Sequence, residues 1–249
     1  MRVKVGTCGW SVRGGRKAYY SYFGVIELQD TFYRIPRLST VERWRADAPE
    51  DFEFVVKAWQ GITHPPSSPT WRKAGQKIPP EKREKYGFFK PTSEVFEAWD
   101  TVKRICETLK SKICVFQTPP SFRCTEENVR NMRDFFSAIS RGNLVLAWEP
   151  RGDWYNNLPK LKEVLEDLQL VHVVDPLKRQ PLRITPIMYF RLHGLGPRDV
   201  NYRYKYSDID LEKLKTYVLK LEGPEEAYVM FNNIYMFDDA LRFKKLLED

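Results

Sequence analysis

Eight short apolar segments alternate with longer amphipathic segments, and this alternation restricts the fold more than any other feature of the chain. The segments rich in Val, Ile and Phe predict strands at residues 3–7, 25–29, 52–58, 113–117, 144–149, 171–175, 187–193 and 227–231. Helical spacing fills most of the intervals, as at residues 91–109, where Val95, Trp99 and Val102 fall on one apolar stripe. Strands that alternate with helices predict parallel pairing with right-handed crossovers.

This element order, in a chain of 249 residues, predicts an α/β fold of the (β/α)8 TIM-like barrel type. We expect one domain over residues 1–249. An open, doubly wound sheet is the alternative, but the G-x-G-x-x-G fingerprint that such sheets carry after their first strand is absent. Further helices are expected at residues 39–49, where Ser39 and Thr40 supply a cap, and at residues 125–139, 158–168, 208–221 and 237–248.

Two connections depart from the regular pattern. The sixth crossover, residues 176–186, is short and shows no helical spacing. The segment 59–91 follows the third predicted strand, lacks periodicity and carries many prolines. Such a stretch in a compact domain is usually a functional loop or a disordered one. The sequence therefore predicts a long inserted loop after the third strand.

Positive charge is concentrated in the predicted loops that follow the strands. The chain has a net charge of +8, whereas these loops together carry +13, which leaves −5 for the remainder. The insertion contributes most, with seven cations against two carboxylates. All these loops share one face of a barrel, so the excess predicts an anionic partner such as DNA or RNA. A merely solvated loop is the alternative for the insertion.

Aromatic residues accompany the basic residues in two places. In the insertion they are Trp71, Tyr86, Phe88 and Phe89, which either stack on nucleobases or fix the loop to the barrel. In the sequence NYRYKY, residues 201–206, an extended backbone would place the tyrosines on one side and the cations on the other. A stacking surface and a packed loop strand are both compatible with that pattern.

The remaining composition excludes several classes of protein. No apolar run approaches the ~20 residues that cross a bilayer, and the chain begins with a charged strand rather than a signal peptide. We therefore expect a cytoplasmic protein without a membrane partner. The four cysteines form no C-x-x-C pair, and three histidines argue against a site built from several of them. One Mg²⁺ or Mn²⁺ held by carboxylates stays open as a cofactor.

Polar side chains close seven of the eight predicted strands, at the end where a parallel barrel carries its active site. In LVLAWEPRGDW, residues 144–154, Pro150 stops the strand just after Glu149, so this carboxylate should stand at the barrel mouth beside Arg151. A structural ion pair is the alternative. The catalytic candidates are Glu149, Glu27, Asp175 and His193. The substrate-binding candidates are Lys57, Arg151, Arg191, Gln117, Tyr33, Asn232, Tyr202 and Tyr206.

Several motifs together resemble the family known as domain of unknown function 72. They are GTCGWS, ELQDTFYRIP, FVVKAWQGITHPPSSPT, VFQTPPSF, AWEPRGDW, YFRLHG and VMFNN. The resemblance covers nearly the whole chain and is nearest to the archaeal branch, because Gln29 stands where the bacterial branch has asparagine. It implies a TIM-barrel fold but no established reaction. Frequent proline and charge, with few Asn and Gln, suggest a thermophilic source.

The fold implied by this resemblance is similar in outline to the xylose-isomerase and apurinic-endonuclease group. The chain lacks the histidines that hold the metal centres of that group, so the similarity is one of fold, which does not carry function. Most strand-end candidates also fall within the family's motifs.

These features favour an enzyme that hydrolyses a phosphodiester or another phosphorylated substrate. Glu149 would serve as general base or acid, with Lys57, Arg151 and Arg191 holding the anion. Glu27 or Asp175 would orient Glu149 or hold one divalent ion. A non-catalytic nucleic-acid-binding protein is the first alternative, and a glycoside hydrolase with paired carboxylates is the second. The sequence does not indicate an oligomeric state.

Overall fold

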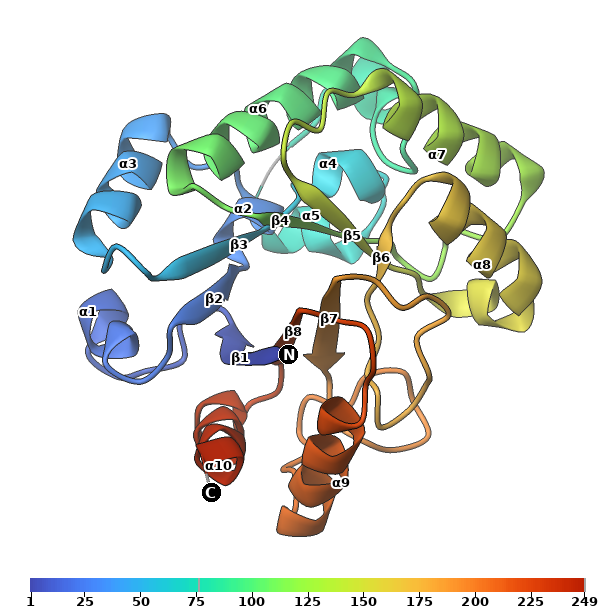
Figure 1. Cartoon of the computed structure of the whole chain (residues 1–249). Helices are drawn as coiled ribbons and strands as arrows, with labels where there is room; N and C mark the ends of the chain where they lie inside the picture. The colour runs from blue at the N-terminus through green and yellow to red at the C-terminus, as the bar shows by residue number, and fades with distance from the viewer. Residues whose placement is uncertain (76, 249) are drawn as a thin grey trace. The chain divides into compact units, whose positions relative to one another are not determined.

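The eight strands lie where the apolar segments predict them, in a computed structural model that describes residues 1–75 and 77–248 (Figure 1). Gln76, inside the predicted insertion, and Asp249 lie outside the described residues. The strands are β1 (Arg2–Cys8), β2 (Val25–Leu28), β3 (Glu53–Lys57), β4 (Ile113–Gln117), β5 (Val145–Glu149), β6 (Val171–His172), β7 (Ile187–Leu192) and β8 (Glu226–Phe231). Only β6 is much shorter than expected, and Val174 continues it as a single bridge to Phe190.

Helices follow the strands in the expected order, and residues 176–186 contain none. The α-helices are α1 (Gly15–Tyr20), α2 (Asp30–Tyr33), α3 (Leu38–Asp47), α4 (Gln60–Thr63), α5 (Pro69–Lys73), α6 (Ser93–Leu109), α7 (Glu126–Ala138), α8 (Leu158–Asp167), α9 (Asp208–Leu219) and α10 (Met236–Glu248), and the 3₁₀ helices are η1 (Pro80–Lys85) and η2 (Gly152–Asn156). The expected cap of the helix at 39–49 is wrong, because α3 begins at Leu38 and contains Ser39 and Thr40.

The chain divides into two units. The first unit contains residues 1–27, 47–53 and 171–249. Its strands pair in parallel in the order β2-β1-β8-β7, and Glu226, Ala227 and Tyr228 oppose Arg2, Val3 and Lys4. Helix α10 packs against β1, β8 and α9. These pairings align the carboxyl ends of β2, β7 and β8, where Glu27, His193 and Asn232 lie.

The second unit contains residues 28–46 and 54–170. Its strands pair in parallel in the order β3-β4-β5, and α6 and α7 run along the outer side of this sheet (Figure 1). Both helices begin at a threonine cap: Thr92 Oγ1 accepts a hydrogen bond from Val95 N, and Thr125 Oγ1 accepts one from Asn128 N. Their apolar faces bury a cluster of Trp99, Phe116, Phe135 and Phe136.

The insertion between β3 and α6 is an ordered part of the second unit. Its end pairs with its beginning, because Gly87 N donates to Gly61 O at 2.8 Å and Phe89 N donates to Ile62 O at 2.9 Å. Trp71 and Phe89 are buried, and Trp71 Nε1 donates to His64 O at 3.1 Å. Two of the four aromatic residues of the insertion are thus fully buried and fix it to the unit, as one of the two interpretations predicted.

All five strand pairings within the two units are parallel, and the alternation of strands and helices confirms the α/β class. Among the described residues, no helix combines the length and the apolar character that a membrane span requires. A single domain over 1–249 stays a prediction.

Candidate functional site

Three polar residues of the second unit share one face of its sheet at the carboxyl ends of the strands. Gln117 of β4 lies opposite Glu149 of β5, and Lys57 of β3 lies opposite Val115, two residues before Gln117. Partners in parallel strands point to the same face, and so do residues two apart. Lys57, Gln117 and Glu149 therefore project together. Lys57 Nζ donates to Gln117 Oε1 at 2.8 Å and to Gln29 Oε1 at 3.3 Å.

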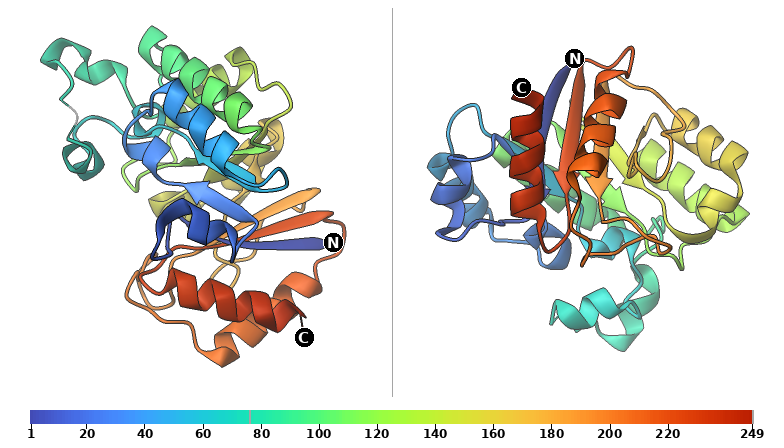
Figure 2. Two further views of the ribbon diagram at one scale, coloured as in Figure 1. Left: turned by 90° about the vertical axis from the view of Figure 1, so that its left-hand side faces the viewer. Right: turned by 90° about the horizontal axis from the view of Figure 1, so that it is seen from below.

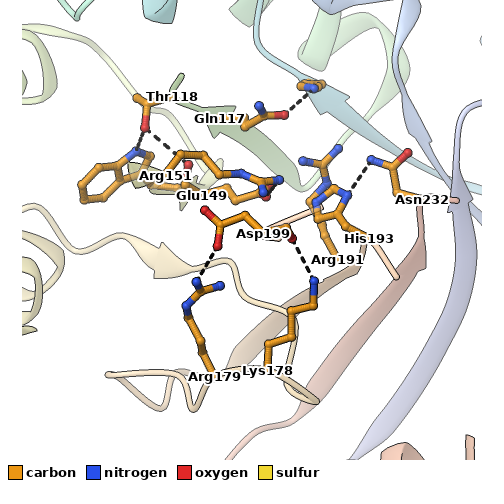
Figure 3. A network of polar contacts seen from close by, with 12 residues as sticks. Gln117, Thr118, Glu149, Arg151, Lys178, Arg179, Arg191, His193, Asp199 and Asn232 are labelled. Atoms are coloured by element: carbon orange, nitrogen blue, oxygen red, sulfur yellow. Dashed lines mark hydrogen bonds and ion pairs between the residues drawn. The ribbon is translucent and has the colours of Figure 1, made fainter. Parts of the chain in front are cut away.

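The end of β5 combines a buried carboxylate with a buried guanidinium. The side chains of Glu149 and Arg151 are 6% and 10% exposed and form an ion pair (Figure 3). Pro150 ends the strand, while the backbone of Glu149 still accepts a hydrogen bond from Thr118 N at 3.2 Å. Arg151 Nε is buried and has no hydrogen-bond partner within residues 1–75 and 77–248. A buried donor without a partner is costly, so an acceptor atom of a ligand would stabilise it.

Lys57 is held in place from the backbone side. Thr31, at the start of α2, donates its hydroxyl hydrogen bond to Lys57 O at 2.7 Å. The ammonium group lies 4.1 Å from the centroid of the Phe32 ring. Lys57 is nearly buried, and this cation–π contact and the two amide oxygens hold its charge without a carboxylate in those contacts.

His64 stands beside this cluster but is unsuited to proton transfer near neutral pH. Burial, and to a lesser extent the charge of Lys57, lowers the pKa of His64 to about 3. The ring is therefore neutral, and its Nδ1 lies 2.8 Å from the hydroxyl oxygen of Thr63. We assign His64 to the packing of the insertion.

Within the first unit, Glu27 and Arg191 form an ion pair without any exposed side-chain surface. Arg191 Nη2 lies 2.9 Å from Glu27 Oε1, and Tyr189 donates its hydroxyl hydrogen bond to Glu27 Oε2 at 2.8 Å. Burial, reinforced by the charge of Glu27, raises the pKa of Tyr189 well above its usual value. The two charges compensate each other in a region without solvent.

His193 and Asn232 meet at the ends of β7 and β8. Asn232 Nδ2 and His193 Nδ1 are 3.2 Å apart (Figure 3), and the edge of the Tyr202 ring contacts the imidazole at a centroid distance of 6.0 Å. Gly194, at a φ of +79°, turns the chain away immediately after His193, where a Cβ atom would lie 2.1 Å from Asn201 O. This turn lets Asn201 N donate to His193 O at 2.8 Å.

Asp175 follows β6 and is the carboxylate of the first unit whose properties best suit proton transfer. Burial raises its pKa to about 6, although hydrogen bonds from the backbone of Leu177 and His193 and from the Tyr206 hydroxyl oppose the shift. The Tyr206 hydroxyl lies 3.4 Å from Asp175 Oδ2 and accepts a hydrogen bond from Gly194 N at 2.7 Å. A carboxyl group with such a pKa exchanges a proton near neutral pH.

Arg179, a loop cation after β6, is paired with the carboxylate of Asp199, which the sequence analysis missed, and Lys178 contacts the backbone of the same residue. Arg179 lies 2.5 Å from the Asp199 carboxylate, and Lys178 Nζ donates to Asp199 O at 2.9 Å (Figure 3). Neither sequence separation nor periodicity links these residues, which come from different loops. The Asp199 carboxylate therefore offsets part of the positive charge of the loop after β6.

The predicted surface of three tyrosines in residues 201–206 is wrong. The segment is a turn followed by irregular backbone rather than an extended strand, so alternation does not apply. Tyr202 is exposed, but Tyr206 is buried with its hydroxyl on Asp175. Tyr204 instead donates its hydroxyl hydrogen bond to Asp210 at 2.7 Å.

The comparison with protein families agrees with these motifs and their positions. The family described as "Protein of unknown function DUF72" matches residues 4–249. This chain belongs to that family. A curated relative, UPF0759 protein YunF of Bacillus subtilis, is 27% identical and covers 93% of this chain and 85% of its own length. The crystal structure of a DUF72 family protein from Thermotoga maritima is 25% identical, with a TM-score of 0.72 and full coverage of both chains.

More distant structures show the fold of this DUF72 protein. Endonuclease IV from Thermus thermophilus matches 100% of this chain and 98% of its own, with a TM-score of 0.55 and 11% identity. D-psicose 3-epimerase matches with a TM-score of 0.59 and 10% identity, over 99% and 98% of the two chains. Both are TIM-barrel proteins, so the predicted (β/α)8 fold is confirmed. At these identities the likeness shows the fold alone.

The described residues of this DUF72 protein offer no ready ligand set for a metal ion. Residues 1–75 and 77–248 contain no group of three or more His, Cys, Asp or Glu side chains placed to hold one. Of the two carboxylates suggested for Mg²⁺ or Mn²⁺, Glu27 is paired with Arg191, and Asp175 accepts hydrogen bonds from Leu177 N and the Tyr206 hydroxyl. We therefore derive no chemical step through a metal.

Most of the predicted site residues fall into two groups, one in each unit. The structure brings Lys57, Gln117, Glu149 and Arg151 together in the second unit. In the first unit it joins Glu27 with Arg191, His193 with Asn232, and Asp175 with Tyr206. Tyr33 is separate from all of these contacts, since its hydroxyl accepts a 3.4 Å hydrogen bond from the exposed Lys73.

Proposed function

We propose that this protein is an enzyme that acts on a phosphorylated, anionic substrate, with nucleic acid as the favoured class and phosphodiester hydrolysis as the reaction. The observation that carries this proposal is the cluster at the carboxyl ends of β3, β4 and β5. It combines two cations, a carboxylate and an amide in a nearly solvent-free setting. Fixed charges in such a setting act more strongly on a substrate than they would in water.

The members of the cluster suit different parts of the reaction. Lys57 offers a point charge, and Arg151 offers a planar donor whose Nε has no partner among the described residues. A phosphate that binds Arg151 would weaken its pairing with Glu149. The released carboxylate would then take a proton from the attacking water, while that oxygen bonds to phosphorus and the P–O bond of the leaving group breaks.

Taken by itself, the first unit contains residues that suit proton transfer rather than anion binding. With a pKa of about 6, Asp175 is partly protonated just below neutral pH and suits the role of an acid. His193, held by Asn232, is a second candidate. Glu27 and Arg191 form an ion pair in full burial, so we propose that they position the strands around them.

The names of the fold neighbours support two substrate classes by analogy only. Endonuclease IV points to nucleic acid, whereas D-psicose 3-epimerase points to a free sugar. Two cations in the cluster favour the phosphorylated substrate over a neutral one. This also counts against the glycoside hydrolase, which needs two carboxylates flanking one bond.

A nucleic-acid-binding protein without catalysis is the second candidate, and the exposed cations of residues 71–90 favour it. Such a protein would bind DNA or RNA with an affinity that falls steeply with salt, and it would form no product.

The test is a panel of labelled single-stranded DNA, double-stranded DNA, abasic DNA and RNA, incubated with Mg²⁺, with Mn²⁺ and with chelator. We expect cleavage by the wild type and none by Glu149→Gln, which keeps the shape of the side chain. Glu166→Gln, an exposed position on α8, is the matched control and should cleave as the wild type does. Cleavage by Glu149→Gln at the wild-type rate would refute the role of Glu149. Salt-sensitive binding by all three proteins without any product would favour the second candidate.

A further inference from the structure

The insertion after β3 lines an open pocket of about 900 Å³ whose lining residues all belong to the second unit. Figure 2 shows the segment that carries it, in cyan and teal, projecting from the rest of that unit. Its walls come from residues 65–67 before α5, from α5 itself, and from η1 with the residues on either side of that helix. A volume of this size is typical of sites for small molecules or for one segment of a larger ligand.

The lining of this pocket is dominated by positive charge. Four cations contribute, Arg72, Lys77, Arg83 and Lys90, against one carboxylate, Glu84. These leave an excess of three positive charges. Lys90 lies 3.5 Å from Glu84, so the single carboxylate is already paired.

The other three cations have no carboxylate partner in the part of the chain that the structure describes. Arg83 Nε donates only to the carbonyl oxygen of Ile78, at 3.4 Å, and Arg72 and Lys77 form no ion pair with a described residue. Like charges gathered around one hollow repel each other, and a bound anion would relieve that repulsion. Guanidinium groups also match the geometry of phosphate oxygens.

The remaining walls, apart from Ser67 and Gly75, are apolar and stiff. Pro65, Pro66, Pro79 and Pro80 line the pocket together with Ile78 and Trp71. Proline fixes the backbone angle φ, and Trp71 is anchored through its hydrogen bond to His64 O. A preformed hollow loses little entropy when a ligand binds. Its apolar walls suit the ribose and base that accompany a phosphate in a nucleotide.

We propose that this pocket binds the phosphate groups of a nucleotide unit, at a site separate from the Lys57–Glu149 cluster. The inference deepens the proposed function, because it gives a nucleic-acid substrate a second point of attachment. The shared chemistry is phosphate beside an apolar sugar and base. Its source is either a nucleic-acid strand or a free nucleotide, and the experiment distinguishes them.

The experiment measures the binding of a fluorescein-labelled single-stranded oligothymidylate by anisotropy at low salt. The variant Arg72→Glu/Lys77→Glu changes two exposed residues of the pocket. The control Lys213→Glu/Lys220→Glu makes the same change in net charge at two exposed residues, one in α9 and one at the C-terminal cap of that helix. We expect the pocket variant to bind at least about tenfold more weakly and the control to stay within about twofold of the wild type. Arg72→Gln/Lys77→Gln should give an intermediate loss.

Unlabelled ATP added to the wild type separates the two sources. Competition would identify a free nucleotide as an occupant, and a pocket-dependent loss of binding without competition would identify the strand. Equal affinity of the pocket variant and the control would overturn the inference. That result together with cleavage by the wild type would leave the proposed function standing. Pocket-dependent binding without cleavage of any substrate would refute the proposed function and leave the inference standing.

Discussion

A buried carboxylate needs a compensating charge, and Glu149 and Glu27 obtain theirs in different ways. Glu149 pairs with Arg151, two residues along the chain, so the sequence AWEPR already indicated the contact. Glu27 pairs with Arg191, which is 164 residues away. The positions of Glu27 and Arg191 near strand ends predicted that these two residues would lie near one face. Only the register of β2, β1, β8 and β7 brings Arg191 Nη2 within 2.9 Å of Glu27 Oε1. Pairing between distant residues depends on register, which composition does not specify.

Arg191→Met should lower the free energy of unfolding by about 3–5 kcal/mol, because it removes a charge partner of the fully buried Glu27. The double variant Arg191→Met/Glu27→Gln should recover part of that loss. Urea denaturation measures all three proteins. Arg133→Met removes two half-exposed ion pairs, from α7 to Glu163 and Asp167 of α8, and should cost less than about 1 kcal/mol. A similar small cost for Arg191→Met would contradict the buried pairing.

Asp175→Asn should stabilise the protein at pH 7.5 by up to about 3 kcal/mol. Burial raises the pKa of Asp175 from 3.8 to about 6, so the ionised carboxylate destabilises the folded state above pH 6. As the pH falls from 6 toward 4, the folded protein gains this proton and the penalty disappears. The advantage of the variant should therefore vanish near pH 4. Urea denaturation at both pH values measures this advantage, and Asp134→Asn, at an exposed position, is the control. An equal effect of Asp175→Asn at both pH values would rule out the raised pKa of Asp175.

At the scale of the elements, periodicity located the strands and the long helices, whereas three local features escaped it. Strand β6 ends after two residues, since the chain then turns so that Asp175 accepts the hydrogen bond of Leu177 N. The NYRYKY segment bends instead of extending. The insertion contains α4, α5 and η1, which are too short to produce a periodic signal. Its order depends on backbone pairing around Gly87, which no pattern of side chains reveals.

Gly87→Ala should loosen the insertion. Gly87 has a φ of +82°, and a Cβ atom there would lie 2.5 Å from Pro65 N and 2.6 Å from the His64 carbonyl carbon. We expect a loss of about 3 kcal/mol in local stability from the backbone strain and the clash. Limited trypsin digestion should then cut within residues 72–90 sooner than in the wild type. Gly15→Ala is matched in φ, at +78°, but meets no atom within 4 Å, so it should leave this cleavage unchanged.

At the scale of the whole molecule, the sequence predicted the class, the order of the elements and the family, because each depends on patterns spread along the chain. Local chemistry was harder to predict. Of the charge excess assigned to the loops after the strands, the part carried by Arg179 is paired with Asp199, while Arg72, Lys77 and Arg83 line one pocket. Counting charges by loop predicts the sign of a partner's charge but not the position of a binding site.

The central claim is that Glu149 carries the chemistry on a phosphorylated substrate. The most direct measurement is the single-turnover cleavage rate of a labelled oligonucleotide, at saturating enzyme, for the wild type, Glu149→Gln and the control Glu166→Gln. We predict a rate about 10²–10⁴-fold lower for Glu149→Gln, with an unchanged affinity and an unchanged rate for the control. Equal rates for Glu149→Gln and the wild type would contradict the account.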